Sequence, residues 1–160
     1  MVGAEKKAQA YVVQLQAHID AVRHRAAALP RRPRVYFEEW DEPAISAIRW
    51  VSELVGIAGG DDIFPQRATA SLGRERIVAD PLEVVRAAPD IIIGSWCGKK
   101  FRAEKVRARD GWADVPAVRD GELHEIKSPI ILQPGPAALT DGLDALHAIM
   151  AGWAARRGPA

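Results

Sequence analysis

The stretch 34–64 constrains the fold most, because it reads as a strand, a loop and a helix in immediate succession. Residues 35–37 combine a β-branched side chain with two aromatic ones, which is typical of a strand. Acidic and aromatic residues at 38–42 are expected to form the loop. A helix should follow from Pro43 and end at the Gly-Gly pair 59–60, residues that tolerate positive φ. The apolar positions of this helix recur three and four apart, at Ile45, Ile48, Val51, Leu54 and Val55.

The rest of the chain continues to alternate between strands and helices. Asp80 and Pro81 are typical of a helix start, one as the cap and the other as the first helical residue. The apolar run 90–94 is too short for a helix beside Pro89, so it predicts a buried parallel strand. The other expected elements are an extended start at 62–64, a loop at 66–76, a basic helix at 101–109, extended pieces at 115–118 and 123–126 around an Asp-Gly turn, and a last helix after 133–136. The sequence therefore predicts an α/β fold, a three-layer α/β/α lobe with a short, mostly parallel sheet.

A long helix is expected to precede this lobe. It runs over residues 4–29 and ends before Pro30. Its apolar residues alternate four and three apart and form a heptad seam: Ala8, Val12, Leu15, Ile19, Val22, Ala26 and Leu29. Such a seam has to be covered by the lobe itself, by another domain or by a second copy of the chain, so a homodimer through residues 4–29 stays open. We divide the chain into this backbone-type helix, 1–30, and an α/β substrate-binding lobe, 31–160.

Charge and composition narrow the class of protein. The formal net charge of the 160 residues is +1, which argues against a nucleic-acid partner. Cys97 is the only cysteine and the histidines show no metal-ligand spacing, so no metal site is expected. No run of about 18 apolar residues and no signal-peptide pattern occurs, so the chain as written is expected neither to span a membrane nor to be exported.

Two tryptophans follow the two predicted strands, Trp40 after the first and Trp96 after the second. Open α/β sheets bind ligands at the carboxyl ends of their strands, so both side chains are candidates for stacking on a large planar ligand. The carboxylates at 38–42 or the lysines at 99–100 would then meet its polar rim. The alternative for each tryptophan is packing beneath a loop. Cys97 is either an inert buried thiol or a contact to a metal centre.

No catalytic motif accompanies these loops. The sequence has no Gly-x-Ser-x-Gly elbow and no dinucleotide fingerprint, and His18 and His24 are six residues apart and do not share a helix face. A binding protein, not an enzyme, is therefore the main hypothesis. The alternatives are a small α/β enzyme or regulatory domain that acts on a nucleotide or other cofactor, and a homodimeric interaction module.

The order of the elements resembles a known family. The motifs that carry the resemblance are the long helix before Arg-Pro-Arg-Val-Tyr-Phe-Glu-Glu-Trp, the helix closing on Gly-Gly before Asp-Ile-Phe, Asp-Pro-Leu-Glu leading to Ala-Pro-Asp-Ile-Ile-Ile-Gly, and Leu-Gln-Pro-Gly-Pro before the last helix. This order is similar to the helical-backbone (class III) substrate-binding proteins of ABC importers, in their C-terminal lobe and inter-lobe helix. The cobalamin (vitamin B12) branch is the nearest match.

The resemblance implies two lobes joined by a rigid helix, with cobalamin or a similar metal chelate, such as a siderophore complex or haem, held between them. No catalytic cofactor is implied. A membrane permease is the implied partner, engaged through Glu83, and the implied location is the periplasm or the cell surface. The ligand-binding residues it implies lie in three loops: Trp40, Asp41, Glu42 and Pro43; Phe64; and Trp96, Cys97 and Gly98.

The chain also departs from the family pattern. Whole family members have a second lobe of comparable size before the long helix, and an export signal, and this sequence shows neither. Three explanations remain open: a fragment, a half-protein that pairs with a second copy, or a descendant that has lost transport. Because the sequence shows no signal peptide, a cytoplasmic location is the alternative to the periplasm.

Overall fold

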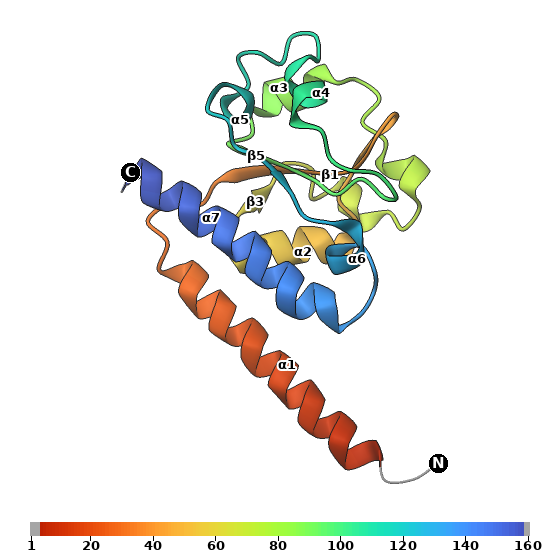
Figure 1. Ribbon diagram of the computed structural model, residues 1–160, viewed down its shortest axis with the longest axis vertical. Coiled ribbons are helices and arrows are strands. Elements are labelled where there is room, and N and C mark those ends of the chain that lie inside the picture. The colour runs from red at the N-terminus through yellow and green to blue at the C-terminus, as the bar shows by residue number, and fades with distance from the viewer. Residues whose placement is uncertain (1–3, 159–160) are drawn as a thin grey trace.

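A computed structural model of the chain describes residues 4–158, and a mostly parallel sheet lies at its centre (Figure 1). The strands are β1 (Arg34–Asp41), β2 (Ala44–Ser46), β3 (Asp61–Asp62), β4 (Ile91–Gly94) and β5 (Leu123–Glu125). Their order is β2-β1-β4-β5, and β3 pairs with the first residues of β1. Only the β1–β2 pair is antiparallel. The predicted α/β fold with a mostly parallel sheet is confirmed.

Helices cover both faces of the sheet (Figure 1). One face carries α2 (Arg49–Ala58), α6 (Ser128–Ile131) and α7 (Leu143–Arg157), which a π-helical turn η3 (Ala138–Gly142) precedes. The other face carries α3 (Leu82–Ala87), α4 (Ala103–Arg107) and α5 (Pro116–Arg119), with the 3₁₀ turns η1 (Arg67–Thr69) and η2 (Gly73–Arg76) nearby. Because side chains alternate along a strand, Val35 and Phe37 enter the core beneath α2 and α7, and Tyr36 enters the opposite one. Both faces of the sheet are buried, which explains the continuous apolar runs.

The long helix α1 (Ala4–Ala27) confirms the expected N-terminal element. Val22 and Ala26, near its end, are buried against the lobe, whereas Tyr11 and Val12 are about half exposed, at 46% and 57%. The first half of α1 runs away from the sheet (Figure 1), so within residues 4–158 nothing covers that part of the seam. The homodimer through this helix stays a prediction. No helix in the range 4–158 is long and apolar enough to cross a membrane.

The region after β1 differs from the prediction. The strand continues through Trp40 to Asp41, and a turn with a cis peptide bond before Pro43 leads into the antiparallel strand β2 instead of a helix. The helix begins only at Arg49. Proline with its fixed φ suits a turn as well as a first helical turn, and Ile45 serves the alternation of a strand as readily as the spacing of a helix.

A second difference concerns residues 115–118, which were expected to be extended. Only Val115 is extended, and α5 begins at Pro116, because proline suits the first helical position, where its missing N–H costs nothing. Gly121, with φ of 77°, then turns the chain into β5, which runs parallel to β4. The Asp-Gly turn is therefore a connection from helix to strand and not a hairpin.

The packing around Gly94 leaves no room for a side chain. A Cβ at this position would overlap the ring of Phe101, which closes over the end of β4. We expect Gly94→Ala to lower the free energy of unfolding by about 1–3 kcal/mol, because overpacking forces side chains and backbone to shift. Urea denaturation measures this, with Gly135→Ala as control, since a Cβ there meets no atom within 4 Å. Equal stability of the two variants would contradict the packing described.

Candidate binding site

The loops that follow β1, β4 and β5 meet at one edge of the sheet, at the right in Figure 1. The register of the parallel strands explains this, since Glu38 of β1 pairs with Gly94 of β4, and Gly94 pairs with Glu125 of β5. The loops begin at Glu42, Ser95 and Ile126. Carboxyl ends of parallel strands are where open α/β sheets bind ligands, so this edge is the candidate site.

A buried ion pair holds two of these loops in place. Glu38 is fully buried and accepts two hydrogen bonds from the guanidinium of Arg109, at 2.8 and 2.9 Å. The indole N–H of Trp96 donates to the same carboxylate at 2.9 Å. The backbone N–H of Ser95 donates to the carbonyl oxygen of Glu38 at 2.8 Å. The start of the loop after β4 is therefore tied to β1 by both side chain and backbone.

A second ion pair fixes the β1–β2 hairpin. Glu39 contacts Arg76 at 2.8 Å and accepts a hydrogen bond from the backbone N–H of Ile48 at 2.6 Å. Arg76 is 3% exposed and also donates to the carbonyl oxygen of Ser46. Burial raises the pKa of Glu39, although the contacts with Arg76 and Ile48 act in the opposite direction. The turn η2 is thereby locked against the hairpin.

Lys99 lies between the two tryptophans of the site. Its ammonium is 4.2 Å from the ring centroid of Trp40 and 5.5 Å from that of Trp96, and it forms an ion pair with Asp41. The Asp41 side chain is 2% exposed, has a second cation, Lys105, at 3.6 Å, and makes no aligned hydrogen bond, so charge carries these contacts. Burial acts to raise the pKa of Asp41, but the contact with Lys99 and the charges of both lysines outweigh burial and hold the pKa below its usual range.

Three hollows open around these residues. The first, of about 290 Å³, lies between the hairpin and the end of α6 and is lined by Trp40, Trp50 and Cys97 among others. The second, of about 540 Å³, lies between the loops after β4 and β5 and includes Trp96 and Gly98. The third, of about 670 Å³, lies between the hairpin turn and helices α3 and α4, and Asp41, Glu42 and Pro43 line it.

The predicted site residues thus come together only in part. Phe64 is 5% exposed and packs edge-on against Tyr36, with ring centroids 5.9 Å apart, and it lines none of the three hollows. Trp96 is 3% exposed and packs against Phe101, as the alternative of packing beneath a loop required. Cys97 is exposed, so the interpretation as a buried thiol is wrong. Glu83 lies on α3 and pairs with Arg67 at 2.6 Å.

Several lining residues were missed from the sequence. Trp50 is the second residue of α2 and donates its indole N–H to the carbonyl oxygen of Ile131 at 3.1 Å. Lys127 and Ser128 line the second hollow, and Leu132 and Gln133 line the first. The last four follow β5, so their position after a strand was the available signal. Within residues 4–158, no three side chains of His, Cys, Asp or Glu gather as they would around a metal ion.

Comparison with known proteins now gives the class. The family model described as periplasmic binding protein matches residues 1–130, so the chain belongs to the periplasmic binding protein family. The family and the solved relatives are described as binding proteins, not as enzymes. No curated protein matches the chain in sequence.

Solved structures share the fold. A periplasmic binding protein from Veillonella parvula is 23% identical, with a TM-score of 0.73 over 94% of this chain and 52% of its own. The heme-binding protein RhuT from Roseiflexus sp. RS-1 is 24% identical, with a TM-score of 0.71 over 92% of this chain and 58% of its own. The vitamin B12 binding protein BtuF of Vibrio cholerae is 16% identical, with a TM-score of 0.71 over 94% and 56%. The chain therefore spans a little over half the length of these relatives.

The Glu38–Arg109 pair gives a prediction for stability. Arg109→Met should lower the free energy of unfolding by about 3–5 kcal/mol, because it leaves the fully buried carboxylate of Glu38 without its cation. Arg107→Met, at the exposed last residue of α4 two positions before Arg109, is the matched control and should change little. Chemical denaturation followed by circular dichroism compares the two, and a loss below about 1 kcal/mol for Arg109→Met would contradict this role.

The lowered pKa of Asp41 predicts how stability depends on pH. A carboxyl whose pKa is depressed in the folded state stabilises the fold above its ordinary pKa, about 3.9, and loses that contribution as the pH falls through the depressed value. Asp41→Asn should therefore be less stable than the wild type at about pH 6, and the difference should vanish toward about pH 2. Urea denaturation across this range measures it, and a difference that does not depend on pH would contradict the assignment.

Proposed function

We propose that this chain forms a ligand-binding lobe of an ABC importer's substrate-binding protein and captures a metal chelate such as cobalamin, haem or a siderophore complex. The observation that carries the proposal is the aromatic edge of the sheet. There Trp40 and Trp50 line one hollow together with the exposed Cys97, directly beside a second hollow that includes Trp96. Indole rings offer large, rigid apolar faces for a planar ligand, and the thiol is a soft donor near its metal.

Family and fold support the same function. The chain belongs to a family of periplasmic binding proteins, and proteins of this fold include one described as binding heme and one described as binding vitamin B12. Binding of this kind needs a preformed site and no proton transfer. Two ion pairs, Arg109 with Glu38 and Arg76 with Glu39, support a preformed site, because they fix the loops before any ligand arrives.

The proposal includes the partner and the location. The lobe would act in the periplasm or at the cell surface, with α1 as the rigid connection to a second lobe, and would deliver its ligand to a membrane permease. Glu83 on α3 is the proposed contact to arginines of that permease. Its side chain is 31% exposed and already holds Arg67 at 2.6 Å, so a permease arginine would compete with Arg67 for the same carboxylate.

A titration of the purified chain with cyanocobalamin and with iron(III) protoporphyrin tests the proposal. We expect saturable binding of at least one of them, and Trp40→Ala should weaken it about tenfold, because one of the two indole rings that line the first hollow is lost. Alkylation of the Cys97 thiol by iodoacetamide should slow when the ligand is bound, which gives an independent readout.

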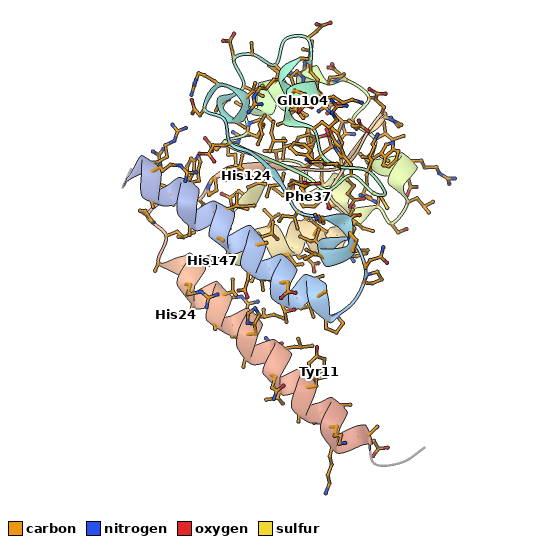
Figure 2. The ribbon with its side chains drawn as sticks, viewed as in Figure 1. Tyr11, His24, Phe37, Glu104, His124 and His147 are labelled. Carbon is orange, nitrogen blue, oxygen red and sulfur yellow. The ribbon has the colours of Figure 1, made fainter. Side chains whose placement is uncertain are left out.

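The matched control is Tyr11→Ala, which removes a half-exposed aromatic ring from the far end of α1 (Figure 2) and should leave both readouts unchanged. Two outcomes would count against the proposal. One is that neither ligand shows saturable binding up to about 1 mM. The other is equal binding by wild type and the Trp40→Ala variant.

A further inference from the structure

The second hollow has an unusual lining for a protein of nearly balanced charge. It measures about 540 Å³ and lies between the loops after β4 and β5, with Lys99, Lys100 and Lys127 among its lining residues and Glu125 as the one acidic side chain. The whole chain has a net charge of +1, so this concentration of lysines is local. Trp96 and Gly98 complete one wall beneath the lysines.

Two of these lysines form no ion pair with another residue of the range 4–158. Among residues 4–158, neither Lys100 nor Lys127 has a carboxylate within ion-pair distance, whereas Lys99 shares that of Asp41. Within residues 4–158 Glu125 forms no ion pair with them, and one of its oxygens accepts a hydrogen bond from the backbone N–H of Phe101 at 3.1 Å. Ammonium groups that line one hollow repel each other, and a ligand with negative charge would relieve that repulsion.

The hollow adjoins the aromatic one, because the loop after β4 lines both. Cys97 belongs to the first hollow, and Gly98 and Lys99 belong to the second. A planar ring that stacks at Trp40 therefore lies next to the lysines at its edge. Ring and lysines together make a site with an apolar floor and a positively charged side.

We propose that the chelate captured here carries at least two carboxylates or equivalent anionic groups at its edge, and that Lys100 and Lys127 bind them. This inference rests on the proposed function and narrows its ligand class. It favours a dicarboxylate metalloporphyrin or an anionic siderophore complex over a corrinoid whose edge carries neutral amides. Lysine suits this task as a flexible point charge that adapts to either group.

The experiment compares iron(III) protoporphyrin, which has two carboxylates, with its dimethyl ester, which has the same ring and no charge at those positions. Binding of each to the full chain is followed by quenching of tryptophan fluorescence, at about 20 mM and about 500 mM salt. We expect the diacid to bind at least about fivefold more tightly at low salt, with most of this preference lost at high salt.

The variant Lys100→Gln/Lys127→Gln should lower the affinity for the diacid to about that for the ester and so remove the preference, because the charge contacts are lost. Lys6→Gln/Lys7→Gln, at exposed positions of α1, is the matched control with the same loss of charge and should keep the preference. Since all four lysines are exposed, both variants should fold like the wild type.

Other outcomes separate the two proposals. Equal affinity for diacid and ester, or a preference that survives in Lys100→Gln/Lys127→Gln, overturns the inference of an anionic ligand. The proposed function still holds in that case, because the porphyrin ring binds. Binding of cyanocobalamin in preference to the diacid also overturns the inference of an anionic ligand and upholds the proposed function. If none of the three compounds binds, the proposed function fails, and this inference fails with it.

Discussion

The arrangement of the binding edge depends on one buried carboxylate. Glu38 lies inside the lobe with no exposed surface, where an unpaired charge would be too costly to keep, so the guanidinium of Arg109 and the indole of Trp96 have to be brought to it. Arg109 comes from the end of the basic segment after β4, and Trp96 comes from the loop that opens it. The carboxylate of Glu38 thereby fixes both ends of the segment 96–109, which contributes to the lining of the hollows.

Much of the fold was accessible from the sequence because its signals were local. The heptad spacing of α1, the Gly-Gly end of α2 and the continuous apolar run of β4 each reflect a backbone or packing requirement within a few residues. The β1–β2 hairpin could not be recognised in this way. It depends on Arg76, some thirty residues further on, which pairs with Glu39 and binds the backbone of β2. Contacts over such a separation leave no periodic trace.

The candidate site shows the same division. Trp40 and Gly98 could be assigned to the candidate edge because the carboxyl ends of parallel strands meet there, although Trp40 is the last but one residue of β1 and not part of the loop. For Phe64 and Trp96 the sequence could not decide between burial and ligand contact, since an aromatic residue in a loop suits a core as well as a ligand. Lys127 was overlooked because the segment after β5 has no aromatic residue to draw attention to it.

The position of Lys99 has a consequence for how selective this lobe is. The ammonium of Lys99 lies over the ring of Trp40 and is held there by Asp41, so this face of the indole is already covered by an intramolecular contact. Any molecule that stacks on this face must displace an intramolecular competitor that is always present at high effective concentration. If Trp40 binds a ligand as proposed, flat aromatic compounds that stack only weakly would bind poorly there, because they could not displace Lys99. In the proposed function, a ligand would have to stack on Trp40 more favourably than Lys99 does.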